Sequence, residues 1–275
     1  MHADTRPRTQ MNPLRSAGVI LDRNRDLPWM IRWGHVAAQV LRGGGDILRA
    51  YPALICVLLA MLVYPRDAGI ASALGSENLG GDVRRELGAW QQFGALGSIL
   101  VVSAVIWALD PARRRRLLDL ALAAGATSLA CLVLKMAISR PRPRLEDAVT
   151  LPGPFGLYPV QTDGGVQLVS GWSSAAADGA QLWSAPSSHT AAAVALAVFL
   201  ATLYPRLTAI VAVLAAVVGF ARVTFGAHWP SDVLLGAAVG FAVAVPVCRS
   251  LAGVSALDWI WRKAVDPSAT SAADP

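Results

Sequence analysis

Charged side chains are scarce in this sequence. Of its 275 residues, only 15% are charged and 55% are hydrophobic, and the mean hydropathy is +0.48. A soluble domain needs more charge to cover its surface, so the composition excludes that class and predicts a membrane protein. Arginines make up 22 of the 24 basic residues, and most of them lie between apolar runs. This placement indicates membrane topology signals and disfavours a nucleic-acid-binding face.

Cysteine and histidine are also rare. The three cysteines, Cys56, Cys131 and Cys248, fall in or beside apolar runs, so we expect no disulfide framework. No group of Cys, His or carboxylate residues has convincing metal-ligand spacing, and we infer neither a metal nor another cofactor. Of only four histidines, His189 opens an apolar run and His228 precedes another. Burying a polar imidazole beside an apolar run costs free energy, so we expect the protein to use these two rings.

Long apolar runs follow residue 46 and predict an all-α, polytopic membrane bundle of six transmembrane helices. Most runs approach the ~20 residues that cross a bilayer core. Gly236 and Gly240 form a GxxxG pair in the last run, which favours close helix packing. The six runs are Ile47–Tyr64, Gln92–Leu109, Leu117–Ile138, His189–Tyr204, Leu207–Phe225 and Ser231–Val247.

The two ends of the chain are more polar than its middle. We expect residues 1–46 to form a cytoplasmic, arginine-rich tail that carries an amphipathic helix over Pro28–Arg42. Tryptophans on one face of that helix and arginines on the other favour a helix in the membrane surface, with packing on the protein's own spans as the alternative. Residues 251–275 are expected to be a second cytoplasmic tail, which leaves 47–250 as the membrane domain.

Arginine placement predicts the orientation. Asp110–Arg116 reads DPARRRR, and the positive-inside rule puts such a short loop in the cytoplasm. Alternating crossings then place the long connection Ser139–Ser188 on the extracytoplasmic side, which in a bacterial inner membrane is the periplasm. Arg66, Arg84 and Arg85 fall on the outer side and weigh slightly against this orientation.

Three blocks of polar residues emerge at that outer face when the crossings are counted. They read KMAISRPRP (Lys135–Pro143), APSSHT (Ala185–Thr190) and ARVTFGAHWPSD (Ala221–Asp232). Loops as long as the one between the first two blocks are usually functional or disordered. We therefore expect two histidines, one carboxylate and several cations to meet at the outer mouth of the bundle.

These residue types suit phosphate chemistry. A multiply charged oxyanion such as phosphate could be bound by Lys135, Arg142 and Arg222, since the arginine guanidinium offers two parallel N–H donors. The helix N-termini after Ser188 and Pro230 point further N–H groups at the same region. Of two histidines, one can attack phosphorus while the other protonates the departing oxygen.

The nucleophilic ring also needs its second nitrogen held by an acceptor. Asp232, four residues after His228, is placed to supply one.

Together the blocks resemble the signature of the phosphatidic acid phosphatase type 2 and vanadium haloperoxidase superfamily: K-x6-RP, PSGH and SR-x5-H-x3-D. Lys135 and Arg142-Pro143 have the spacing of the first block, and Pro186–His189 stands for the second. Arg222, His228 and Asp232 fit the third.

Two positions depart from that signature. Ser188 replaces its glycine, and Ala221 replaces its serine. If the glycine position required a positive φ, a serine there would cost about 1 kcal/mol or more. Ala221 removes one hydroxyl that could contact the anion.

The resemblance implies a metal-independent phosphatase acting on a membrane lipid phosphate or diphosphate. By that resemblance His228 forms a phosphohistidine, Asp232 orients its ring, and His189 is the acid and then the base. The implied phosphoryl clamp comprises Lys135, Arg142 and Arg222, assisted by Ser187 and the Ser188 backbone. Undecaprenyl diphosphate, phosphatidate, phosphatidylglycerol phosphate and lipid A phosphate are the substrates it suggests.

Three alternative functions would use the same residues. A phosphotransferase would pass the phosphoryl group to a lipid instead of water. A vanadate-dependent haloperoxidase would use the same anion site, although six apolar spans argue against that typically soluble branch. A non-catalytic anion-binding membrane protein is the third, and Ser188 and Ala221 are its only hints. Arg140 and Arg144 flank the first block, where we expect a loop or headgroup role.

Overall fold

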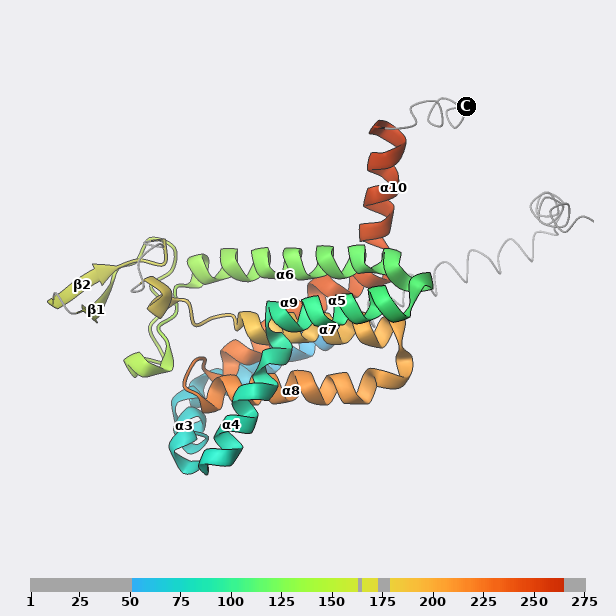
Figure 1. Cartoon of the computed structure of the whole chain (residues 1–275). Helices are drawn as coiled ribbons and strands as arrows, with labels where there is room; N and C mark the ends of the chain where they lie inside the picture. The colour runs from blue at the N-terminus through green and yellow to red at the C-terminus, as the bar shows by residue number, and fades with distance from the viewer. Residues whose placement is uncertain (1–50, 163–164, 173–178, 265–275) are drawn as a thin grey trace, which may run out of the picture. The chain divides into compact units, whose positions relative to one another are not determined.

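The computed structural model describes residues 51–162, 165–172 and 179–264 (Figure 1). The amphipathic helix predicted over Pro28–Arg42 lies outside the described residues. An apolar helix over residues 51–63 leads by a short turn into the next helix. The labelled helices are α3 (Asp67–Ala73), α4 (Gly81–Trp90), α5 (Leu96–Leu109), α6 (Leu117–Ile138), α7 (Ser188–Leu203), α8 (Thr208–Thr224), α9 (Pro230–Ser250) and α10 (Ala252–Ala264).

The predicted count of six spans is not confirmed. Within the described residues, four helices are long and apolar enough to cross a membrane. A fifth span is obtained if α4 and α5, which meet at a 64° bend, are counted together. The four are Tyr51–Ala73, Pro111–Leu145, Pro205–Thr224 and Pro230–Ser250.

The run predicted as a span at His189–Tyr204 is the short helix α7. Its 16 residues rise only about 24 Å, less than the ~30 Å of a bilayer core. α7 contacts α6, α8 and α9, and most of its side chains are buried. Because its neighbours enclose it, α7 need not match the thickness of the bilayer.

Apolar side chains cover the outside of the surrounding helices. Leu100 and Val101 of α5, Leu129 of α6, and Ile210 and Val213 of α8 are all more than half exposed. Such a surface is unfavourable in water and favourable against lipid. The protein is therefore an integral membrane protein.

Small residues let α7 and α9 approach closely. A Cβ at Gly236 would lie 2.4 Å from the carbonyl oxygen of Ser187, and one at Gly240 would lie 2.7 Å from that of Ala191. The predicted close packing at the GxxxG pair is thus confirmed, and α7 is the partner helix. The contact fixes where α7 begins, which matters because His189 lies in its first turn.

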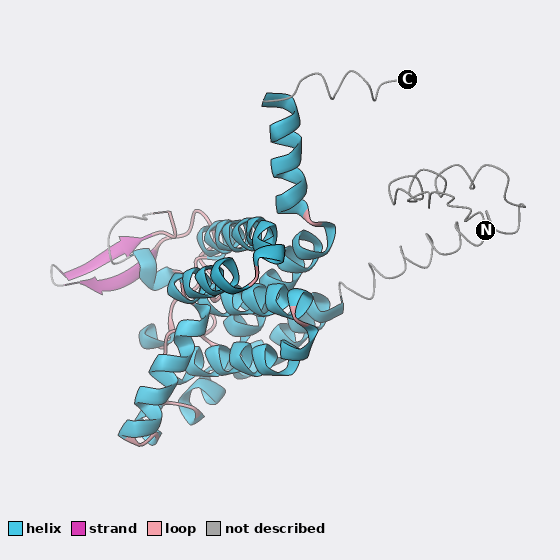
Figure 2. Cartoon of the chain, turned by 45° about the vertical axis from the view of Figure 1, so that its right-hand side comes forward, coloured by secondary structure: helices cyan, strands magenta, loops and turns pink. Residues whose placement is uncertain are grey.

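The long connection contains a β-hairpin, so the all-α prediction was wrong in this detail. Strands β1 (Tyr158–Thr162) and β2 (Gly165–Val169) pair antiparallel, with Val160 opposite Gln167. Val160, Val169 and Leu182 are buried together as a small second core. Figure 2 shows the hairpin as the one sheet of the described chain, beside the bundle.

The hairpin and the four-arginine turn lie at opposite ends of the bundle. The hairpin and the end of α6 lie at one end, and the four-arginine turn Pro111–Arg116 lies at the other (Figure 1). α10 leaves from this arginine end, where the backbone N–H of Gly253 donates to Asp119 Oδ1 at 2.8 Å. The region predicted as a cytoplasmic tail over 251–275 therefore contains a helix that is anchored at its first turn, whereas Trp259 and Trp261 further along it are exposed.

Replacing Gly236 with Ala tests the contact between α7 and α9. The added methyl group would collide with the Ser187 carbonyl, and overpacking of this kind costs about 1–3 kcal/mol. We expect a lower thermal unfolding midpoint in detergent. Gly97→Ala in α5 is the control, because its Cβ would meet no atom within 4 Å. Equal midpoints for the two variants would contradict the packing described here.

Candidate phosphate-binding site

Backbone pairing closes the long connection at its base. The N–H of Ser184 donates to the carbonyl of Arg140 at 3.0 Å, and the N–H of Arg142 donates to that of Gln181 at 2.9 Å. Ser139 ends α6 in a left-handed conformation (φ 53°), which turns the chain toward these partners. The first and second polar blocks are thereby brought side by side.

The third block joins them through the start of α9. After α8 the chain turns at Gly226 (φ 62°), and the N–H groups of Ala227 and His228 both donate to the Arg222 carbonyl. The N–H of Ser187 donates to the carbonyl of Asp232 at 3.0 Å, so α7 and α9 begin next to each other. The structure thus brings together all three blocks that the sequence singled out.

Three cations in this site are held by neutral acceptors. Lys135 Nζ donates to the Trp183 carbonyl at 2.6 Å, and Arg142 Nε donates to the Ala180 carbonyl at 2.9 Å. A guanidinium nitrogen of Arg222 donates to the side-chain oxygen of Gln91 at 3.0 Å. In the described chain, no carboxylate forms an ion pair with any of the three.

The cations therefore keep both charge and free donors for an anion. Arg222 Nε is buried and has no hydrogen-bond partner in the part of the chain that the structure describes. A buried donor without a partner is costly, and a bound oxyanion would satisfy it.

His228 is buried, with only 2% of its surface exposed. Its Nδ1 lies 2.6 Å from the carbonyl oxygen of Ser184. A carbonyl can only accept, so Nδ1 carries the proton and Nε2 keeps its lone pair. Burial lowers the pKa of His228 well below 6.5, and the charges of Lys135, Arg142 and Arg222 lower it further. The ring is therefore neutral at pH 7.

His189 lies in the first turn of α7 and is half-buried. It interacts electrostatically with the same three cations as His228, from α6, the connection and α8. Both rings therefore lie within electrostatic range of the same three cations. Among the described residues, no three His, Cys, Asp or Glu side chains lie close enough together to hold a metal ion.

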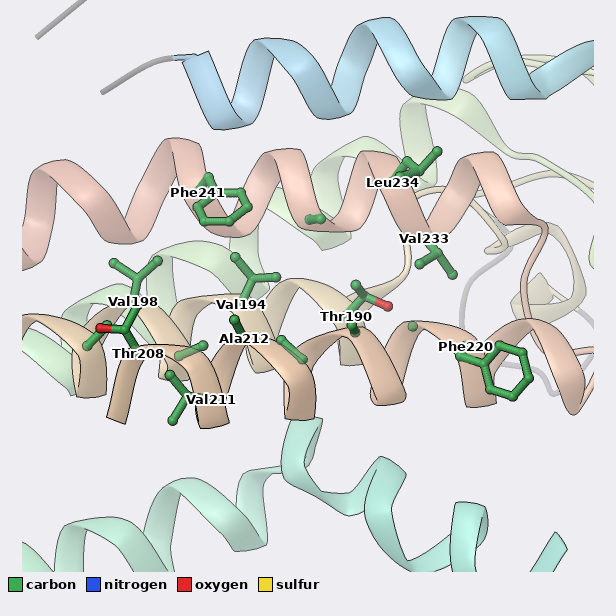
Figure 3. Close-up of a pocket in the computed structure, with 16 residues that line it drawn as sticks. Thr190, Val194, Val198, Thr208, Val211, Ala212, Phe220, Val233, Leu234 and Phe241 are labelled. Atoms are coloured by element: carbon green, nitrogen blue, oxygen red, sulfur yellow. The ribbon is translucent and has the colours of Figure 1, made fainter. Parts of the chain in front are cut away.

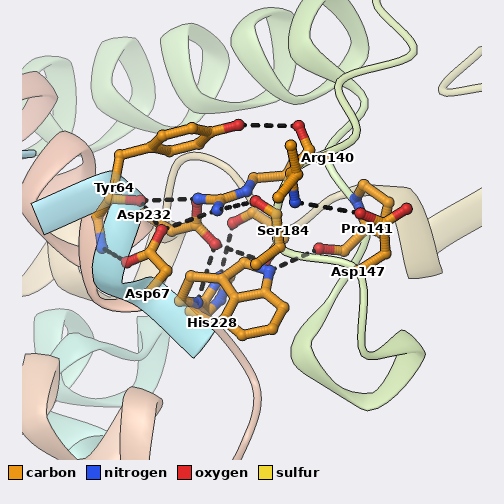
Figure 4. Close-up of polar contacts among 12 residues, drawn as sticks. Tyr64, Asp67, Arg140, Pro141, Asp147, Ser184, His228 and Asp232 are labelled. Carbon is orange, nitrogen blue, oxygen red and sulfur yellow. Dashed lines mark hydrogen bonds and ion pairs between the residues drawn. The ribbon is translucent and has the colours of Figure 1, made fainter. Parts of the chain in front are cut away.

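The sequence suggested that Asp232 holds the His228 ring directly, but in the structure Asp232 binds other partners. Its Oδ1 accepts from Arg140 at 2.7 Å, and its Oδ2 accepts from the Ser184 hydroxyl at 2.5 Å (Figure 4). Oδ2 also accepts the N–H of Trp229, because Asp232 caps the first turn of its own helix. Asp232 thus reaches His228 through Ser184.

Arg140 has a different role from the expected loop or headgroup contact. Only 2% of its surface is exposed, and it pairs with Asp67 Oδ2 at 2.8 Å as well as with Asp232. The sequence analysis also missed Asp67 and Ser184. A carboxylate at the end of the first apolar run was the available signal, since an ionisable residue in such a place is usually functional.

The two departures from the family signature are accommodated. Ser188 is the first residue of α7 and is not among the described residues with a positive φ. The backbone strain that a serine would have at a positive φ is therefore absent. Ala221 is fully buried in α8. The Ser187 oxygen accepts from Thr190 Oγ1 at 3.0 Å and caps α7, which leaves the Ser187 hydroxyl hydrogen to donate to an anion.

Two grooves run along α7. One, of about 550 Å³, lies between α5, α6 and α7 and extends from Leu117 to Ser188 and His189. The other, of about 430 Å³, lies between α7, α8 and α9 and is lined by apolar side chains (Figure 3). Only the first of these two grooves includes a site histidine.

Taken together, a helical membrane bundle gathers three cations and two histidines at one end. A family model described as the PAP2 superfamily matches residues 116–254, which is just over half of the chain. The chain belongs to the PAP2 superfamily. A comparison with curated proteins finds no match.

Two solved structures are similar in fold. One is described as the first transmembrane PAP2 type phosphatidylglycerolphosphate phosphatase from Bacillus subtilis, with 22% identity, a TM-score of 0.50, and coverage of 72% of this chain and 93% of that one. The other is Aquifex aeolicus LpxE, with 16% identity, a TM-score of 0.46, and coverage of 66% and 94%.

The buried, neutral His228 predicts an acid-sensitive fold. Its pKa is about 6.5 when unfolded and lower when folded, so below pH 6.5 the unfolded chain binds more protons. The stabilising contribution is complete above pH 6.5 and decreases by up to about 1.4 kcal/mol per pH unit below it.

Thermal unfolding of the wild type and His228→Gln in detergent measures this contribution. Between pH 7.5 and 5.5 the wild type should lose more stability than the variant, whereas between pH 8.5 and 7.5 the two should change equally. Equal losses over the acid interval would show that His228 is not buried in its neutral form.

Proposed function

We propose that this protein is a membrane lipid phosphatase that forms a phosphohistidine on His228. The observation that carries the proposal is a neutral, buried His228 whose Nδ1 is bound, within electrostatic range of three cations that have no carboxylate partner among the described residues. Phosphoryl transfer depends mainly on positioning and on stabilising charge at the equatorial oxygens, which such a pocket can supply.

In the proposed complex the negative charge of the bound phosphate offsets the three cations, which allows His189 to hold the proton that it donates. In the first step, the His228 Nε2 lone pair attacks phosphorus and the bond from phosphorus to the leaving oxygen breaks. Lys135, Arg142 and Arg222 hold the phosphoryl oxygens, and the buried Arg222 Nε gains a partner. His189 donates its proton to the leaving oxygen, which departs as the lipid alcohol or, from a diphosphate, as the lipid monophosphate.

In the second step, the now neutral His189 accepts a proton from water. The resulting hydroxide attacks phosphorus, the bond from phosphorus to Nε2 breaks, and inorganic phosphate leaves. His228 is again neutral with its proton on Nδ1, and His189 is again protonated. The Ser184 carbonyl holds the Nδ1 proton throughout, so the same nitrogen is presented in each cycle.

The groove between α5, α6 and α7 supports a lipid as substrate. It begins at His189 and runs between apolar helices to Leu117, near the other end of the bundle. A phosphate headgroup in the pocket can therefore leave its hydrocarbon chain in the groove. The phosphatidylglycerolphosphate activity in the description of the Bacillus subtilis structure agrees with this class. Undecaprenyl diphosphate, phosphatidate and lipid A phosphate belong in the same test panel.

Trapping of the phosphoenzyme tests the mechanism. Purified protein given ³²P-labelled lipid phosphates without added metal should release phosphate and, on rapid quenching, carry an acid-labile, base-stable label. His228→Ala should carry no label and lose about 1,000-fold or more in turnover, because the nucleophile is absent. A labelled or active His228→Ala variant would overturn the role of His228.

We further propose that the site faces the extracytoplasmic side. The four-arginine turn lies at the opposite end of the bundle, which supports this orientation under the positive-inside rule (Figure 1). In a bacterium, the site would face the periplasm from the inner membrane.

Cysteine labelling tests the orientation. In a Cys56→Ala background, Phe155→Cys in the long connection should react with an impermeant maleimide on intact cells, since Phe155 is 91% exposed. Arg206→Cys, in the exposed turn between α7 and α8, should react only after permeabilisation. The reverse pattern would place the site in the cytoplasm.

A further inference from the structure

A continuous line of hydrogen bonds leads from the first span to His228. Asp67 of α3 accepts from Arg140 at 2.8 Å, and Arg140 donates to Asp232 at 2.7 Å. Asp232 accepts from the Ser184 hydroxyl at 2.5 Å, and the carbonyl of the same serine accepts from His228 Nδ1 at 2.6 Å. Figure 4 shows Asp67, Arg140, Asp232, Ser184 and His228 together with the dashed contacts that link them.

Both terminal nitrogens of Arg140, in the middle of this line, have two acceptors each, whereas its Nε is buried without a partner among the described residues. Arg140 also donates to Ser231 Oγ at 2.7 Å and to the Ala148 carbonyl at 2.6 Å. Its guanidinium lies 4.7 Å from the ring centre of Tyr64 and 5.6 Å from that of Trp229. Two carboxylates already pair with this guanidinium, so its charge is directed at Asp67 and Asp232 and not at an anion in the pocket.

Asp67 is the anchor of the line. It is 1% exposed, and besides Arg140 it accepts both the backbone N–H of Ser231, at 2.9 Å, and the Ser231 hydroxyl. Ser231 is in the first turn of α9, immediately before Asp232. One carboxylate from α3 therefore fixes the guanidinium and the backbone beside Asp232. Asp67 also lies outside residues 116–254, which the family model matches.

We propose that Asp67 and Arg140 are positioning residues for the His228 ring, acting through Asp232 and Ser184. Asp67 holds Arg140 by an ion pair, and Arg140 holds the Asp232 carboxylate by a second one. The Asp232 carboxylate binds the hydroxyl of Ser184, and the carbonyl of Ser184 selects the Nδ1–H tautomer of His228. The inference rests on the proposed function for its catalytic consequence, whereas the placement and tautomer of the ring can be measured without activity.

Asp67→Asn is the principal test, and Asp119→Asn is its matched control. Both aspartates are fully buried, pair with an arginine and accept backbone N–H groups, but Asp119 lies on α6 near the arginine end of the bundle. We expect Asp67→Asn to reduce kcat about tenfold or more with KM changed less than about twofold, since misplaced reacting groups slow the chemical step. Asp119→Asn should keep kcat per folded molecule.

A spectroscopic readout separates positioning from general stability. ¹⁵N-histidine NMR of the wild type should report His228 as the Nδ1–H tautomer, and Asp67→Asn should reduce that population whereas Asp119→Asn should not. If Asp67→Asn does not fold, Ser231→Ala serves instead, because it removes contacts to Asp67 and Arg140 without removing a charge; a smaller change in the same direction is expected.

Two results would overturn the inference. Either an unchanged His228 tautomer in the variant or equal kcat for Asp67→Asn and Asp119→Asn would show that Asp67 only stabilises the fold. If the wild type hydrolyses no lipid phosphate, the proposed function fails, and the tautomer comparison still decides the positioning role.

Discussion

The buried ion pair between Arg140 and Asp232 joins the two halves of the site. Arg140 belongs to the segment that leaves α6, and Asp232 opens α9, 92 residues later in the chain. Breaking a pair of this kind leaves an uncompensated buried charge and typically costs about 3–5 kcal/mol. The start of α9, the base of the long connection and Ser184 therefore hold their positions together, and the Ser184 carbonyl holds the ring of His228.

The cations of the site divide into two groups by their partners. Arg140 has two carboxylates, and its charge is balanced inside the protein. Lys135, Arg142 and Arg222 have carbonyl and amide acceptors, so their charge is not balanced by the described chain. Such a group of cations favours a multiply charged anion, and the proposed function assigns the attack on that anion to the neutral Nε2 of His228. Structural rigidity and anion binding are thus assigned to different side chains.

Much of the site could be predicted from the sequence because its signals are local. Apolar runs and the DPARRRR loop order the crossings, and counting them brings His189, His228 and Arg222 to one rim. The spacing within the three blocks then identifies the family. The GxxxG pair also predicted close packing, although α7 could be recognised as its partner only in the structure.

The remainder depends on contacts between distant segments. The four-residue spacing of His228 and Asp232 is compatible with direct contact, yet Asp232 turns back to cap its own helix and binds Ser184 instead. Asp67 meets a guanidinium 73 residues away, and no local pattern specifies such a pairing. The length criterion for a membrane span is not met by α7, which is shorter than a bilayer core is thick. Other helices enclose α7, so it need not match the thickness of the bilayer. The hairpin was missed because its short strands lie in a Gly- and Pro-rich connection.

An experimental structure of the protein with vanadate would test the position of His228 most directly. Vanadate adopts the five-coordinate geometry of a phosphoryl group in transfer, so it reports which atom attacks. We expect vanadium within bonding distance of His228 Nε2, with its oxygens on Lys135, Arg142 and Arg222 and with His189 facing the opposite, apical oxygen. Vanadate held by the cations while His228 Nε2 points elsewhere, or vanadate bound outside this pocket, would contradict the assignment of His228 as the nucleophile.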